Sequence, residues 1–143
     1  MATSAKPLKN FTLHLDEGFD CPEVRAALDR AGIKYISLSN SFPSGTEDSK
    51  ILEVVGKRGW TRITLDRNNR YRHIEKDNIL RFRVRQFVFR ANLGGHALAN
   101  LLVTCYPRMR EFARLHGRPF VAHITKGGTI HLRLDKDGQT SHP

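Results

Sequence analysis

The sequence predicts an α/β fold with a central, mostly parallel β-sheet. Strand patterns and helix patterns alternate from residue 11 to residue 65, and the connections between them are short. A strand followed by a helix and another strand forms a right-handed crossover, and repeated crossovers build a parallel sheet. The composition agrees, because 39% of the 143 residues are hydrophobic and 27% are charged, as in a globular domain with a buried core.

The first strand and the first helix are marked by clear patterns. Apolar and polar residues alternate over 11–15, which predicts a strand that ends at the acidic pair Asp16-Glu17. Apolar residues then recur at helical spacing from Pro22, which suits a first helical turn, and the pattern stops at Gly32. A second strand is expected over 34–38.

A loop, a helix and a third strand follow. Residues 39–45 are rich in Ser, Pro, Asn and Gly, which predicts a loop. Ser44 and Glu47 have the spacing of a capping box, which predicts the start of a helix. The third strand is expected over 60–65, and like the first strand it ends on an acid, Asp66.

The second half of the chain is expected to complete the sheet. A short helix is expected near 74–80, followed by a strand over 82–89, although part of that segment could also end a helix. The longest helical pattern opens at Gly94, and Pro107 is expected to kink or divide it. A β-hairpin over 120–134 closes the pattern, with its turn at a pair of glycines.

One domain is expected over residues 1–143, with its core at about 10–134 and short polar tails. No apolar run approaches the ~20 residues that a membrane helix needs, and the N-terminus lacks the apolar stretch of a signal peptide. Cys21 and Cys105 form no CxxC pattern, as expected of apolar residues in a reducing compartment. We therefore expect a cytoplasmic protein without membrane contact.

The excess of positive over negative charge lies in the second part of the chain. The net charge is +10, yet residues 1–66 carry nine basic and nine acidic groups. Residues 67–90 carry eight basic against two acidic groups, and residues 91–143 carry seven against three. A polyanionic partner such as nucleic acid would account for this excess. A basic surface that only keeps the protein soluble is an equally good explanation.

Acidic residues stand where parallel strands would bring them together. Asp16 and Asp66 end the first and third strands, and Glu47-Asp48 opens the helix between them. Clustered carboxylates repel one another unless a cation lies among them, and hard oxygen ligands select Mg²⁺ or Mn²⁺. Such ions activate water for attack on a phosphodiester. The arginines that follow directly are expected to hold the substrate; they are Arg67, Arg70 and Arg72.

A structural explanation of these acids stays open. An acid at the end of a strand is often a helix cap, and Asp48 could simply complement a helix dipole. The seven histidines show no paired-ligand spacing, which argues against zinc.

The order of these motifs resembles that of the PIN-like nuclease family, and most closely its branch of VapC-type toxins and uncharacterised relatives. In that family the first strand ends in Asp, often Asp-Glu, as in Asp16-Glu17 here. A second Asp follows a Gly-containing loop and precedes Ile-Leu, as in Asp48-Ser-Lys-Ile-Leu52. The third strand ends in Thr-x-Asp, as in Thr64-Leu-Asp66. The similarity covers about residues 10–90 and is weak beyond them.

The resemblance implies a three-layer α/β/α sandwich and cleavage of RNA with Mg²⁺ or Mn²⁺. It implies that Asp16, Asp48 and Asp66 are catalytic residues and metal ligands, with Glu17 as a further ligand. A protein antitoxin commonly inhibits such nucleases, so RNA and a cognate antitoxin are the expected partners. A homodimer is left open.

One departure from the family pattern matters. Many relatives have Asp-x-Asp where this chain has Asp66-Arg-Asn68. Asn68 can coordinate or orient water but adds no charge, and Glu47 and Glu75 are the other auxiliary candidates. We expect a metal-dependent endoribonuclease, the toxin of a toxin–antitoxin module. The alternative is a non-catalytic RNA-binding or protein-interaction module on the same fold.

Overall fold

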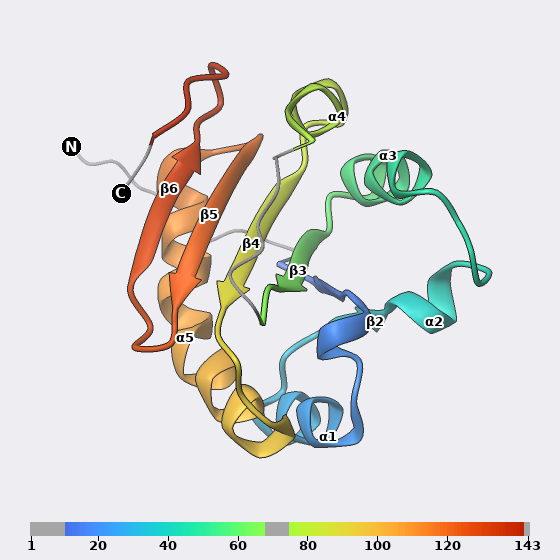
Figure 1. Cartoon of the computed structure of the whole chain (residues 1–143), viewed down its shortest axis with the longest axis vertical. Coiled ribbons are helices and arrows are strands. Elements are labelled where there is room, and N and C mark those ends of the chain that lie inside the picture. The colour runs from blue at the N-terminus through green and yellow to red at the C-terminus, as the bar shows by residue number, and fades with distance from the viewer. Residues whose placement is uncertain (1–10, 68–74, 142–143) are drawn as a thin grey trace.

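The computed structural model describes residues 11–67 and 75–141. Within these residues, six strands form one sheet in the order β2-β1-β3-β4-β5-β6 (Figure 1). Neighbouring strands pair in parallel from β2 to β5, and only β6 is antiparallel to its neighbour. The strands are β1 (Leu13–Leu15), β2 (Tyr35–Ser37), β3 (Thr61–Leu65), β4 (Arg85–Arg90), β5 (Phe120–Thr125) and β6 (Ile130–Leu134).

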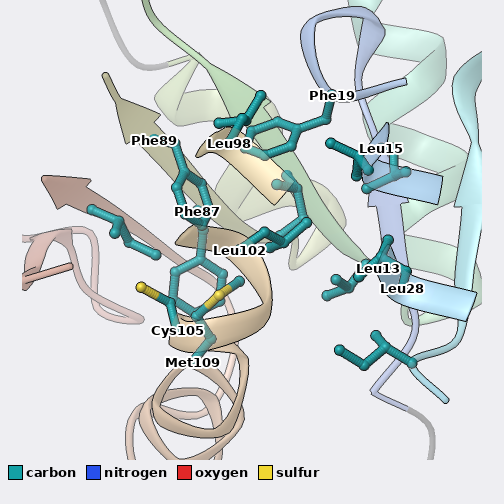
Figure 2. Close-up of a cluster of buried hydrophobic side chains, with 14 of the residues drawn as sticks. Leu13, Leu15, Phe19, Leu28, Phe87, Phe89, Leu98, Leu102, Cys105 and Met109 are labelled. Atoms are coloured by element: carbon teal, nitrogen blue, oxygen red, sulfur yellow. The ribbon is translucent and has the colours of Figure 1, made fainter. Parts of the chain in front are cut away.

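Helices cover both faces of this sheet. One face packs against α1 and α5, and Figure 2 shows apolar side chains of β1 and β4 directed toward those of α5. The other face packs against α3 and α4 in a second, smaller cluster. The helices are α1 (Pro22–Ala31), α2 (Leu38–Ser41), α3 (Asp48–Arg58), α4 (Lys76–Phe82) and α5 (Gly95–His116), with a 3-10 turn, η1 (Glu17–Phe19). The expected three-layer sandwich with a mostly parallel sheet and a C-terminal hairpin is therefore confirmed.

The sharpest sequence signals agree with the structure. Pro22 lies in the first turn of α1, and Gly32 ends the helix with a positive φ of 70°, which a residue without a Cβ adopts at little cost. In α5, by contrast, Pro107 does not divide the helix, which is continuous over its 22 residues. The buried residues of α5 lie on both sides of Pro107, so both halves of the helix pack into the same core and the helix stays continuous.

The segment before α3 differs from the expectation. Residues 38–41 form the short helix α2, where a loop was predicted. The capping box was also wrong, because α3 begins at Asp48 with Glu47 as its N-cap, and Glu47 makes no capping hydrogen bond through its side chain. The Thr46 hydroxyl instead donates to the Pro43 carbonyl at 2.6 Å. This closed turn moves the start of the helix beyond Ser44.

Smaller shifts occur in the second half. The helix α4 takes up Phe82, so β4 begins three residues later than the predicted strand at 82. The residues directly after β6 fold back, and Thr140 forms an antiparallel bridge with Leu134. No helix in the described residues is long and apolar enough to cross a membrane.

A glycine sets the distance between α3 and α4. A Cβ added to Gly56 would lie 1.9 Å from the carbonyl oxygen of Phe82. This contact is with backbone, which cannot rotate away as a side chain can. The two helices therefore pack at this distance only because residue 56 has no side chain.

We expect Gly56→Ala to lower the free energy of unfolding by about 1–3 kcal/mol, because α3 and α4 must separate to admit the methyl group. Urea unfolding followed by circular dichroism measures the change. Gly127→Ala is the matched control, since its Cβ would meet only the Thr125 hydroxyl, at 3.9 Å. Equal stability of the two variants would show that α3 and α4 are not held at this distance.

Candidate functional site

The carboxyl edge of the sheet is where predicted site residues meet. Asp16 directly follows β1 and Asp66 directly follows β3, and these strands are parallel neighbours. The backbone N–H of Asp16 donates to Ile63 at 3.0 Å, and that of Asp66 donates to Phe89 at 2.8 Å. The sheet ladder therefore continues through both acids and fixes where their side chains start.

A cleft of about 490 Å³ opens at this edge. Four carboxylate residues line it together with apolar and polar residues of α2 and the following turn. Three of the four were predicted site residues, whereas Asp20 was missed. The four acids are Asp16, Glu17, Asp20 and Asp48.

Asp20 is the most firmly held of these acids. The Ser39 hydroxyl donates to Asp20 Oδ2 at 2.9 Å, and Arg25 forms an ion pair with Oδ1. Burial acts to raise the pKa of Asp20, but hydrogen bonds from Ser39 and Arg25 outweigh it and lower the pKa. Asp20 is therefore a carboxylate at neutral pH that ties η1 to α1 and α2. The only feature of the sequence that pointed to Asp20 as a site residue was its place at the end of the same acidic stretch as Asp16.

A close backbone approach brings the cleft against β3. A Cβ added to Gly18 would lie 2.9 Å from the Cβ of Leu65, so η1 reaches the end of β3 only with glycine at its centre. Leu65 immediately precedes Asp66. The turn that carries Glu17 is thus placed directly beside the strand that carries the third predicted acid.

Asp66 itself lines a different and more basic pocket, of about 230 Å³. The Nε of Arg90, at the end of β4, lies 3.7 Å from Asp66 Oδ2. Arg67 also lines this pocket, and its Nη1 donates to the Leu93 carbonyl at 2.7 Å. Lys126, which follows β5, adds a third cation. The carboxyl edge therefore holds an acidic cleft over β1 and a basic pocket over β3, β4 and β5.

A buried arginine lies beneath the acidic cleft. Arg62 on β3 is only 9% exposed. Its Nη2 lies 3.9 Å from Asp16 Oδ1, and its Nη1 donates to Gln86 Oε1 at 3.5 Å. The positive charge of Arg62 competes with any other cation for the Asp16 carboxylate.

The donor chemistry of the cleft suits Mg²⁺ or Mn²⁺, because carboxylate oxygens are the ligands that these ions prefer. Asp16 and Asp48 share the cleft, and Mg²⁺ is often held by only one or two carboxylates together with substrate phosphate. The described residues contain no group of three or more His, Cys, Asp or Glu side chains close enough to hold a metal ion. The structure thus brings Asp16 and Asp48 to one cleft and places Asp66 in the neighbouring pocket.

The remaining predicted site residues fall into two groups. Glu47 and Glu75 are the N-cap residues of α3 and α4, and neither lines the cleft or the basic pocket. The others lie outside the described residues, so their roles stay predictions; they are Asn68, Arg70 and Arg72.

A buried histidine supports the wall of the cleft. His14 on β1 stacks on Trp60 with ring centroids 5.4 Å apart, and its Nε2 lies 3.0 Å from the Ser41 hydroxyl oxygen at the end of α2. The Ser41 hydroxyl donates to Ser37, so it accepts the proton of Nε2. His14 Nδ1 is buried and has no hydrogen-bond partner in the described residues. Burial, and then the charge of Arg62, lower the pKa of His14 to about 4.

Stability should therefore fall as the pH drops from 6.5 toward 4, because the unfolded histidine binds a proton in this range and the folded one does not. Each such histidine contributes a slope of at most about 1.4 kcal/mol per pH unit. Burial also lowers the pKa of His123 to about 4, so two residues contribute. Urea unfolding between pH 4.5 and 7 should give a flatter slope for His14→Gln than for the exposed control His96→Gln. Identical slopes would contradict a neutral, buried His14.

Comparison with known proteins identifies the family. No curated protein and no solved structure matches the chain. A sequence model described as a PIN-like domain matches residues 13–91, which is more than half of the chain. The matched segment runs from β1 to the residue after β4 and includes Asp16, Asp48 and Asp66. The chain therefore belongs to the PIN-like domain family.

Proposed function

We propose that the protein is a metal-dependent ribonuclease that hydrolyses phosphodiester bonds within RNA. PIN-like domains are generally nucleases that use divalent metal ions. The observation that carries the proposal is the pair Asp16 and Asp48 in one open cleft at the carboxyl edge, with a basic pocket beside it. Ligands of open α/β sheets bind at this edge.

In this proposal Asp16 and Asp48 hold Mg²⁺ or Mn²⁺, with Glu17 as a further ligand. The bound ion would supply activation of water and neutralisation of charge on the phosphate. Asp16 is fixed by its backbone hydrogen bond to β3. Asp48 lies in the first turn of α3, which fixes where its side chain starts. Both side chains therefore start from ordered backbone at the edge of the cleft.

The basic pocket would hold the substrate. Arg67, Arg90 and Lys126 present donors for phosphate oxygens, and the arginine forks match phosphate geometry. Asp66 stays a proposed catalytic residue. Its position beside Arg90, at the boundary between the basic pocket and η1, lets it orient a phosphate or water there. Arg70 and Arg72 extend the proposed RNA contact along the chain.

The finer parts of the proposal rest on the resemblance to VapC-type toxins. The protein would act in the cytoplasm as the toxin of a two-gene module, and an antitoxin protein would cover the site.

One observation favours a second function. The described residues bring no three metal-ligating side chains together, and arginines already lie near Asp16 and Asp66. A non-catalytic RNA-binding module would need no more than this. Metal binding separates the two functions, because only the nuclease requires an ion at the cleft.

Asp16→Asn and Asp48→Asn should each lower Mn²⁺ affinity at least about tenfold and abolish cleavage of a defined RNA, since each removes a charged ligand. Titration calorimetry and a cleavage assay with purified protein measure both effects. Glu47→Gln is the matched control, because it lies next to Asp48 but does not line the cleft. Failure of the wild type to bind Mn²⁺ would favour the non-catalytic module. If Glu47→Gln lost as much Mn²⁺ affinity and cleavage activity as Asp48→Asn, the assignment of Asp48 as the ligand would be wrong.

Expression in a bacterial host tests the toxin role separately. Wild-type protein should arrest growth by cleaving cellular RNA. Asp16→Asn should not arrest growth, because the substitution removes a charged ligand of the metal ion. Growth curves with immunoblots at matched expression give the comparison. Arrest by both proteins would contradict a toxic activity that depends on cleavage.

A further inference from the structure

Three arginines gather at the amino edge of the sheet, opposite the acidic cleft. Arg83 precedes β4 by two residues, Arg85 is the first residue of β4, and Arg118 precedes β5 by two residues. Because Arg85 pairs with Phe120 in the parallel ladder, the starts of β4 and β5 lie side by side (Figure 1). We refer to Arg83, Arg85 and Arg118 as the arginine cluster.

Two members of the arginine cluster reach the same end of α3. Arg85 Nη1 donates to the Gly59 carbonyl at 3.1 Å, and Arg118 Nη1 donates to the Gly56 carbonyl at 3.4 Å. These carbonyls lie at the C-terminal end of α3, where the helix dipole is negative. The guanidinium groups of Arg85 and Arg118 are therefore oriented by backbone, and each has donors left over for another partner.

The positive charge of the cluster is not balanced locally. Among the described residues, no ion pair joins Arg83, Arg85 or Arg118 to a carboxylate. Burial and the charge of Arg118 lower the pKa of Arg85, and burial and the charge of Arg83 lower that of Arg118. The last turn of α3 adds two exposed cations at the same end of the helix, Lys57 and Arg58.

The backbone of Arg83 is a further sign that the cluster is not incidental. Its φ is 56°, and it is the one residue other than glycine with a positive φ in the described part of the chain. Glycine or asparagine would adopt this conformation at lower cost. An arginine is present instead, next to two others.

We propose that the arginine cluster is a second phosphate-binding site, which holds the backbone of a nucleic-acid strand away from the catalytic edge. Guanidinium forks bind phosphate oxygens in pairs, and close like charges are favourable once a polyanion lies between them. The proposal rests on the proposed function in one respect, that the strand is RNA.

The spacing of the two sites decides which RNAs would use both. The arginine cluster and the basic pocket lie at opposite ends of β4 and β5, strands of six residues each. At ~3.3 Å per residue these ends are about 20 Å apart. A tetranucleotide, stacked at ~3.4 Å per nucleotide, spans roughly 14 Å and reaches only one site, whereas a 30-nucleotide strand can reach both.

The test is RNA binding by Arg83→Gln/Arg118→Gln, measured by fluorescence anisotropy with metal chelated so that no cleavage occurs. Arg85 is left intact because it is partly buried against α3. For a 30-nucleotide RNA we expect affinity to fall about tenfold and the slope of log affinity against log salt to flatten by about 1.4. Tetranucleotide affinity should fall less, because a tetranucleotide reaches only one site and can still bind the basic pocket. Arg30→Gln/Lys34→Gln, which removes the same charge from exposed residues near β2, is the matched control.

Equal affinity and slope for the double variant and its control would overturn the proposal. The arginine cluster would then serve to stabilise the end of α3 or to bind an acidic protein. Thermal unfolding shows whether the double variant folds. If it does not, Arg83→Gln alone is used, since Arg83 is exposed, and its slope should flatten by about 0.7. An absence of RNA cleavage by the wild type would contradict the nuclease but not this site, because binding is read without metal.

Discussion

The pairing of β3 with both of its neighbours is the constraint on which the site depends. Alternate residues of β3 face opposite layers, so Ile63 packs into the core formed with α1 and α5, whereas Arg62 lies under the acidic cleft. A shift of one residue in register would exchange these faces and bury Asp66 among apolar residues. The same ladder runs through the backbone of Asp16 and Asp66 and places both acids at one edge. Core packing therefore fixes the geometry of the charged residues.

The acids at the carboxyl edge lie near arginines. Arg62 lies near Asp16 and Arg90 lies near Asp66, so each acid has a cation from the neighbouring strand. The distances, 3.9 and 3.7 Å, are longer than those of hydrogen-bonded ion pairs. Each guanidinium group offsets part of the repulsion between the carboxylates at this edge. Arg62 also competes with any added cation for the Asp16 carboxylate.

The sequence predicted most of the features that depend on local chemistry, and it missed the contacts that depend on strand order. Pro22 and Gly32 mark the ends of α1 because each fits a backbone conformation that its neighbours do not disturb. The capping box failed because the turn closed by Thr46 competes for the same residues. The strand ends at Asp16 and Asp66 were predictable from alternation alone. The arginine partners of these acids were not predictable, because only the strand order β1-β3-β4 brings each arginine to its acid.

The distribution of charge takes on a spatial meaning once the topology is known. The basic excess begins after Asp66 in the sequence, which is also where the chain enters the β4–β5 half of the sheet. Cations therefore gather at both ends of these strands, with Arg90 at the carboxyl end and Arg85 at the amino end. Acids of the first half, among them Asp16 and Asp20, line the cleft at the carboxyl end of β1. The same chain thus separates a short acidic zone, suited to an ion, from a longer basic zone, suited to a polyanion.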